Sequence, residues 1–233
     1  MNSLQQDYNA LVVGASGGIG SAIADALERD RRCGGVIRLS RRSYPGFDVT
    51  DEASVAAAAA QVASEVGGLD LIFNATGALT IEGIGPEKSL KAIDPAAMLR
   101  QFALNAVGPA LLIKHFSPLL PRDRRGLFAS LSARVGSIGD NHLGGWISYR
   151  AAKAAQNQIV RTAAIEIART RPLSVVAVLH PGTVETALSA GFRGNHAAVP
   201  ASDAAANLLA VLDTLTPENT GGFFAYDGSA IEW

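Results

Sequence analysis

Short apolar runs alternate with longer alanine-rich stretches along the chain. The apolar runs are continuous, which is typical of strands covered on both faces of a parallel sheet. They lie at 10–13, 35–40, 69–73, 126–132, 173–179 and 222–226. The longer stretches have the composition of helices. These predicted helices lie at 21–29, 51–66, 95–116, 146–169 and 202–215.

The alternation predicts an α/β fold, specifically a Rossmann-type doubly wound parallel sheet with helices on both faces. The chain has 233 residues, of which 48% are hydrophobic and 24 are glycine. This length fits one domain over 1–233 with a sizeable core. No linker or internal repeat interrupts the pattern.

Charge and composition argue against several classes of function. A net charge of -1 gives no electrostatic reason to expect a nucleic-acid or membrane partner. Charge, glycine or proline interrupts every apolar run, so we expect no membrane span. The polar segment 1–7 lacks the layout of a signal peptide. The single Cys33 excludes an internal disulfide and fits a reducing compartment, which predicts a cytoplasmic protein. The four histidines lack metal-ligand spacing, so we expect no metal site.

A glycine-rich turn follows the first predicted strand and leads into the first predicted helix. Its residues include Gly14, Ser16, Gly18, Ile19 and Gly20. Glycines let backbone N–H groups approach a pyrophosphate, and a helix N-terminus offers it partial positive charge. The spacing is G-x-x-x-G-x-G, and it predicts a dinucleotide site. The alternative is a turn that is merely tight.

The second predicted strand ends at Ser40-Arg41-Arg42, where the adenosine ribose of a dinucleotide would lie. An acidic residue there selects NAD, whereas guanidinium groups suit a 2′-phosphate. The sequence therefore favours NADP(H) over NAD(H), unless both arginines are solvated loop charges. Asp48, followed by Val49, would lie near the adenine edge, with a plain turn aspartate as the alternative.

Two later strand ends extend the predicted cofactor site along the same edge of the sheet. After the third strand, small residues that leave room for a ribose include Asn74, Ala75 and Gly77. After the fifth strand, Thr183 and Thr186 would hydrogen-bond a carboxamide, or else begin the next helix. The neighbouring cofactor candidates are Pro181, Gly182 and Val184. Residues 187–200 form a candidate flap over the substrate.

Tyr149 and Lys153 are four residues apart in a predicted helix and therefore share one face. A nearby ammonium favours the phenolate and lowers the tyrosine pKa, and such a phenol exchanges protons with a carbonyl or alcohol. The alternative is a solvated helix face. In the helix at 95–116, Pro109 cannot donate to the carbonyl of Asn105. That carbonyl should be free to hold a water, and the helix should bend there.

Together these motifs resemble the short-chain dehydrogenase/reductase family. The stretches around 132–150 and the tail 227–233 are similar to its C-factor and sniffer-type carbonyl reductase branch. The resemblance implies that Tyr149 is the general acid/base and that Lys153 lowers its pKa and binds the nicotinamide ribose. It also implies that Asn105 holds a water linked to Lys153. The hydride would come from the cofactor.

One position departs from the family. The family usually places two serines in a row here, the second one catalytic, but this chain has Ser132-Ala133. We expect Ser132 to replace the missing serine, with Ser137 as the second candidate. A shift of one place turns a strand side chain to the opposite face, so Ser132 needs a strand that has ended or bulged. Trp146 would line the substrate pocket, or pack in the core or an interface.

These features predict an NADP-dependent oxidoreductase that interconverts a ketone or aldehyde and its alcohol. The alternative is a non-catalytic NADP-binding protein with a signalling role, because the expected serine is absent. A small molecule would be the substrate, and its identity cannot be predicted. By analogy with the family, we expect a homodimer or homotetramer that uses the helices at 95–116 and 146–169.

Overall fold

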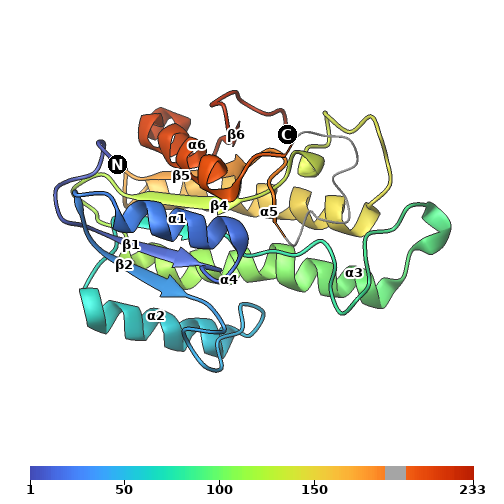
Figure 1. The fold of residues 1–233 in the computed structure, drawn as a ribbon, viewed down its shortest axis with the longest axis horizontal. Helices are drawn as coiled ribbons and strands as arrows, with labels where there is room; N and C mark the ends of the chain where they lie inside the picture. Colours follow the sequence, from blue (N-terminus) through green and yellow to red (C-terminus); the bar gives the residue numbers. More distant parts are fainter. Residues whose placement is uncertain (187–197) are drawn as a thin grey trace.

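Six parallel strands form one sheet in the order β2-β1-β3-β4-β5-β6 in the computed structural model (Figure 1). The structure describes residues 1–186 and 198–233. The order reverses at β1, which pairs with β2 on one side and with β3 on the other. Such a switch point is where open parallel sheets bind ligands. The strands are β1 (Tyr8–Val13), β2 (Cys33–Leu39), β3 (Leu71–Asn74), β4 (Leu127–Leu131), β5 (Val175–His180) and β6 (Phe223–Ala225).

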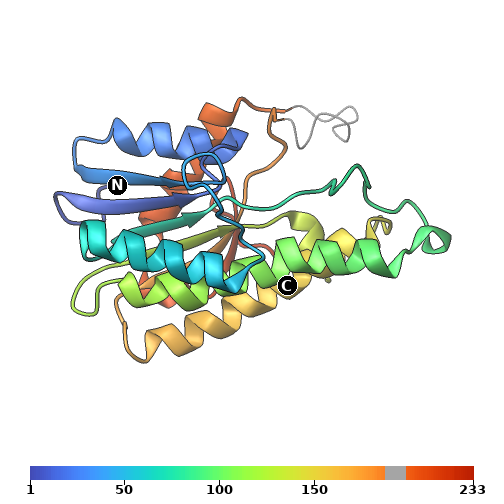
Figure 2. The same ribbon diagram turned by 90° about the horizontal axis from the view of Figure 1, so that it is seen from below.

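Helices cover both faces of this sheet (Figure 2). One face carries α1 (Gly18–Glu28) and α6 (Ala201–Thr214), which pack on each other. The other carries α2 (Glu52–Val66), α3 (Pro95–Phe102), α4 (Gly108–Phe116) and α5 (Ile147–Ala168). Each layer has its own apolar core, one around Ile23 and Leu208 and one around Phe116 and Val160. The predicted doubly wound α/β architecture is therefore confirmed.

The predicted helix at 95–116 is confirmed as one run of helical residues. A π-helical turn, Ala103–Val107, lies between α3 and α4, and its last bond runs from the Gly108 N–H to the Ala103 carbonyl. The irregularity lies where Pro109 removes a donor, as the sequence indicated. The run Pro95–Leu119 is long and apolar enough to cross a membrane by composition alone, so the expectation of no such stretch was too strong. Here it packs against α2 and α5.

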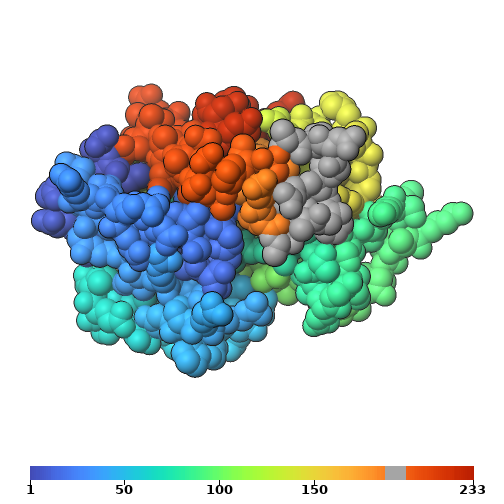
Figure 3. Space-filling view, viewed as in Figure 1, coloured from blue at the N-terminus to red at the C-terminus, as the bar shows by residue number. Residues whose placement is uncertain are grey.

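Two local features complete this part of the fold. Asp51 caps α2, because its carboxylate accepts from the Ala53 N–H. The segment 78–94 contains a short 3₁₀ turn, Leu90–Ala92, and projects from one end of the molecule (Figure 3). Most of the candidate flap, 187–197, lies outside the described residues.

Candidate functional site

The glycine turn between β1 and α1 has the geometry of a phosphate cradle. Gly14 has φ +83° and its N–H donates to the Leu39 carbonyl at 2.8 Å, so the turn lies beside the end of β2. A Cβ at Gly20 would lie 2.2 Å from the Gly14 oxygen, which leaves room only for glycine. Helix α1 begins at Gly18, and its first N–H groups lack intrahelical acceptors. These backbone groups fit a pyrophosphate.

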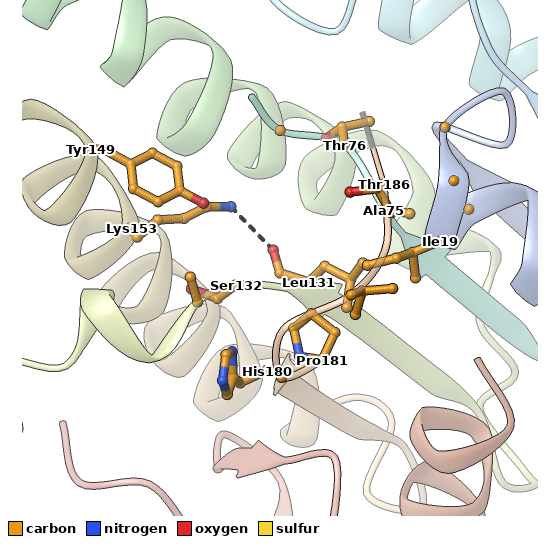
Figure 4. Close-up of a pocket in the computed structure, with 17 residues that line it drawn as sticks. Ile19, Ala75, Thr76, Leu131, Ser132, Tyr149, Lys153, His180, Pro181 and Thr186 are labelled. Atoms are coloured by element: carbon orange, nitrogen blue, oxygen red, sulfur yellow. Dashed lines mark hydrogen bonds between the residues drawn. The ribbon is translucent and has the colours of Figure 1, made fainter. Parts of the chain in front are cut away.

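A cavity of about 320 Å³ lies beside this turn, at the carboxyl edge of the central strands (Figure 4). A volume of this size is within the range of small-molecule sites. Predicted residues that line it are Gly18, Ile19, Gly20, Ala75, Gly77, Ser132, Tyr149, Lys153, Pro181, Gly182, Val184 and Thr186. The fold thus brings five separate parts of the chain to one cavity.

Tyr149 and Lys153 are both buried, and their polar ends point toward the middle of the cavity (Figure 4). The Lys153 Nζ lies 5.9 Å from the centroid of the tyrosine ring. It donates to the Leu131 carbonyl at 3.2 Å and to Gln156 Oε1 at 2.8 Å. The spacing therefore marks a buried polar face and not a solvated one.

Burial dominates the protonation of this pair. It raises the pKa of the Tyr149 phenol and lowers the pKa of Lys153 to about 7. The expectation that the nearby ammonium lowers the tyrosine pKa is therefore wrong, because burial raises it. At neutral pH the phenol carries its proton, which suits a proton donor.

Ser132 meets the condition that the sequence set for it. Strand β4 ends at Leu131, so Ser132 lies beyond the last paired residue, although its N–H still donates to the Leu179 carbonyl at 2.9 Å. Its Oγ is buried and has no hydrogen-bond partner among the described residues. Ala133 lines the same cavity. Ser137 is outside the lining, and its Oγ accepts from the Asp140 N–H.

Asn105 lies in the π-helical turn and is fully buried. Its Nδ2 donates to the Ala78 carbonyl at 2.9 Å and to Gln101 Oε1 at 2.7 Å. Its Oδ1 accepts from the Ala78 N–H at 3.1 Å. The side chain thus ties the segment after β3 to the helix layer beside Gly77. That Asn105 holds a water stays a prediction.

The remaining cofactor candidates are outside the cavity lining. Ser40 is buried at the end of β2, where its Oγ accepts from the Arg42 N–H, while Arg41 and Arg42 are exposed. Asp48 accepts from Thr50, and these hydrogen bonds lower its pKa, as in a turn aspartate. Gly14 and Ser16 lie in the glycine turn, and Val49 is buried. The side chain of Asn74 accepts from the Thr76 N–H, and the carbonyl of Thr183 accepts from the Val199 N–H.

The N-terminus of α5 is held by Glu87 from the segment 78–94. Its carboxylate accepts from the Ser148 N–H at 3.2 Å and from the Ser148 hydroxyl, and its carbonyl accepts from the Trp146 N–H. Trp146 has φ +54°, a strained value for this residue type, and its ring meets Tyr149 edge-on at 6.4 Å. Trp146 packs against the tyrosine and is outside the lining of the 320 Å³ cavity.

Several site residues were missed by sequence reasoning. Thr76, Leu131 and His180 line the cavity, and Gln156 holds Lys153 from behind. Burial, and then the charge of Arg134, lower the pKa of His180 to about 4, so it is neutral at physiological pH. His180 could have been found, because it directly precedes Pro181 at a ligand edge. A second cavity of about 520 Å³ lies under the segment 78–94, beside Gln101 and Ser148.

Comparisons with known proteins agree with this geometry. A family model described as short chain dehydrogenase matches residues 8–196. A 1-hydroxy-2-glutathionyl-2-methyl-3-butene dehydrogenase from Rhodococcus sp. (strain AD45) is 35% identical over 189 residues, 81% of this chain and 79% of that protein. C-signal from Myxococcus xanthus is 38% identical over 149 residues, 62% of this chain and 84% of that protein. The NADPH-bound carbonyl reductase from chicken fatty liver shares the fold, with a TM-score of 0.82 at 24% identity over 99% of this chain and 96% of that chain.

Proposed function

The chain belongs to the short-chain dehydrogenase/reductase family, and from that premise we propose that it interconverts a ketone or aldehyde and the corresponding alcohol, with NADP(H) as cofactor and Tyr149 as proton donor. It is an oxidoreductase of this family. The proposal depends on one observation, namely that the candidate catalytic residues and the glycine turn line the same cavity. Tyr149, Lys153 and the unpartnered hydroxyl of Ser132 line it together with the glycine turn.

The residues divide the chemistry between them. Tyr149, protonated at neutral pH, gives its proton to the carbonyl oxygen as that oxygen gains negative charge. Ser132 donates a hydrogen bond to the same oxygen, which explains a buried hydroxyl without a protein partner. Lys153, when charged, stabilises the phenolate that is left behind. When bound, the cofactor supplies the hydride.

NADP is the better candidate cofactor for two reasons. The end of β2 and the glycine turn are joined by hydrogen bonds from the Gly14 and Ala15 N–H groups to the Leu39 carbonyl. The exposed Arg41 and Arg42 follow this strand end closely in the chain, which supports a 2′-phosphate site beside the glycine turn. The chicken liver structure of the same fold has NADPH bound. The guanidinium groups of Arg41 and Arg42 suit a 2′-phosphate better than a free 2′-hydroxyl.

Turnover of a broad panel of ketones and aldehydes, followed by the loss of NADPH absorbance, tests the proposal. Tyr149→Phe removes the transferable proton and should lower kcat by at least about 10²-fold, the usual contribution of a positioned acid. NADPH binding, measured by fluorescence titration, should persist. Tyr44→Phe is the matched control, because Tyr44 lies near Glu65 and outside the cavity lining. Turnover that survives in Tyr149→Phe would refute the role of the phenol.

A regulatory, non-catalytic role is the second candidate, and the similarity to C-signal favours it. Ala133 in the usual place of the catalytic serine points the same way. The hydroxyl of Ser132 argues for catalysis, since it is buried without a partner among the described residues and lines the same cavity as Tyr149 and Lys153. NADPH binding without turnover of any substrate in the panel would favour the regulatory role.

A further inference from the structure

A chain of buried amides links β4 to α5 directly behind Lys153. Gln156 is fully buried, and its Nε2 donates to Ser130 Oγ at 2.8 Å and to the Leu131 carbonyl at 2.9 Å. Ser130 Oγ also accepts from Asn74 Nδ2 at 2.9 Å. The Gln156 Oε1 accepts from the Lys153 Nζ at 2.8 Å. Gln156 therefore joins the strand end to the lysine through both ends of one amide.

The chemistry of its neighbours fixes the orientation of this amide. The Leu131 carbonyl can only accept a hydrogen bond, and a lysine ammonium can only donate. Rotating the Gln156 amide by half a turn would set its NH₂ against the Lys153 ammonium and its oxygen against the carbonyl. Both contacts would be repulsive in a buried site. The observed arrangement is thus the one that satisfies all the groups.

This arrangement also fixes where the lysine ammonium lies. Two of its three N–H donors are taken by protein acceptors, the Gln156 Oε1 and the Leu131 carbonyl. The third is left for a ligand in the cavity. Gly77 allows this approach, since a Cβ there would lie 3.2 Å from the Nζ. A buried ammonium without the glutamine would keep a single protein acceptor and lose part of its stabilisation.

We propose that Gln156 is a positioning residue that fixes the Lys153 ammonium at the cavity wall and stabilises its charged form. The significance for catalysis rests on the proposed function, in which charged Lys153 assists Tyr149. An apolar residue in place of Gln156 removes an acceptor and favours the neutral amine. A carboxylate in its place adds an opposite charge and favours the ammonium.

The other titratable and charged groups around Lys153 are neutral or paired elsewhere, so its hydrogen bond to Gln156 is the contact that a substitution can change. The titratable phenol of Tyr149 stays protonated at neutral pH, and His180 on β5 is neutral. Arg134, in the 3₁₀ turn Arg134–Gly136 packed against α5, is paired with Asp140 at 3.7 Å. Burial is the cause of the lowered lysine pKa. Charged groups on the neighbouring α3 and α4 are engaged elsewhere, Arg100 with Glu82, and Lys114 and His115 with Glu52.

Lysine NMR tests the proposal on the protein without cofactor. The chain has only four lysines, Lys88, Lys91, Lys114 and Lys153, so ¹³Cε-lysine labelling gives few signals, and Lys153→Arg assigns the one of interest. We expect the titration midpoint of Lys153 to fall by at least about half a unit in Gln156→Met, through the lost acceptor. In Gln156→Glu it should rise by at least about one unit, as for an opposite charge at this distance.

Gln158 provides matched controls, because it lies on the exposed side of the same helix and bonds Thr162. Gln158→Met and Gln158→Glu should leave the Lys153 midpoint unchanged. A general loss of stability would move the Lys153 midpoint in the same direction in both Gln156 variants. Midpoint shifts of opposite direction therefore cannot come from it. Equal midpoints in the wild type and in either folded Gln156 variant would overturn the proposal, and circular dichroism establishes folding.

The pH profile of kcat/KM separates this inference from the proposed function. Its basic limb should move in the same direction as the Lys153 midpoint in each variant. Shifted midpoints without carbonyl reduction by any protein would refute the proposed function and leave the role of Gln156 intact. Carbonyl reduction together with unshifted Lys153 midpoints would refute the role of Gln156 and leave the proposed function intact.

Discussion

The charges of two exposed side chains decide the cofactor in our proposal. Arg41 and Arg42 follow the buried Ser40 at the end of β2 and have no ion pair among the described residues. Replacing both by alanine should weaken NADPH binding by at least about tenfold, since each charge-assisted hydrogen bond to a phosphate contributes about 1.5–3 kcal/mol. NADH, which lacks the 2′-phosphate, should bind as before. Fluorescence titration of both nucleotides measures the ratio.

Arg31→Ala is the control for this experiment, because it removes an exposed arginine from the opposite end of β2. It should leave both affinities unchanged. Equal losses for NADPH and NADH in the double variant would mean that the arginines act through the fold or through general charge, and the preference for NADP would lose its basis.

Single residues could be predicted where the chemistry depends on short spacing. Tyr149 and Lys153 share a helix face at four residues, and neighbouring glycines of the G-x-x-x-G-x-G motif are four or fewer residues apart. Gln156 could not be predicted in the same way. Its role depends on a strand carbonyl 25 residues earlier, and nothing local distinguishes it from an ordinary helix residue. Ser132 was ambiguous because the direction of its side chain depends on where β4 ends.

At the scale of elements, the pattern of apolar runs predicted all six strands and their parallel pairing. It succeeds because strands buried on both faces need no polar alternation. The π-helical turn was only partly predictable, since Pro109 signals an irregularity but not its type. The start of α5 shows a further limit. Its first N–H groups depend on Glu87, 61 residues away from Ser148, and no local capping signal reveals this.

Glu87 is therefore predicted to position the catalytic helix. Burial raises its pKa, but the hydrogen bonds from Ser148 outweigh that effect and lower the pKa overall. Glu87→Ala should lower the free energy of unfolding by about 1 kcal/mol at neutral pH, as for other lost helix caps. Because the Glu87 pKa is lowered in the folded state, ionised Glu87 stabilises the fold at pH values above the ordinary glutamate pKa. The difference in unfolding free energy between the wild type and Glu87→Ala should therefore shrink as pH falls through the folded-state pKa. Denaturation at several pH values measures it.

Glu82→Ala is the companion variant, from the same projecting segment. Glu82 is exposed and pairs with Arg100 at 3.4 Å, a contact that contributes little. Glu82→Ala should therefore change the free energy of unfolding by less than about 0.5 kcal/mol. If Glu87→Ala and Glu82→Ala behave alike at every pH, Glu87 does not cap α5.

The whole molecule buries one apolar layer on each side of its sheet, yet it leaves apolar side chains exposed on the outer helices. Leu99 on α3, Val107 in the π-helical turn and Ile165 on α5 are 71%, 47% and 51% exposed. These elements pack against one another along one side of the molecule (Figure 2). Isolated exposed apolar residues are common, but three on adjacent elements form a candidate self-association surface.

We predict that this surface joins two copies of the chain. Cyclic dimers use one patch twice, and a stable interface buries about 800 Å² on each partner, which requires an apolar centre of this kind. The wild type should therefore show about twice its chain mass of 24.1 kDa in sedimentation. Leu99→Glu combined with Ile165→Glu places like charges across the two-fold axis and should give monomers. Leu173→Glu, a change of equal charge at a 45% exposed leucine before β5, should not. A monomeric wild type, or a double variant that stays dimeric, would place any partner on another face.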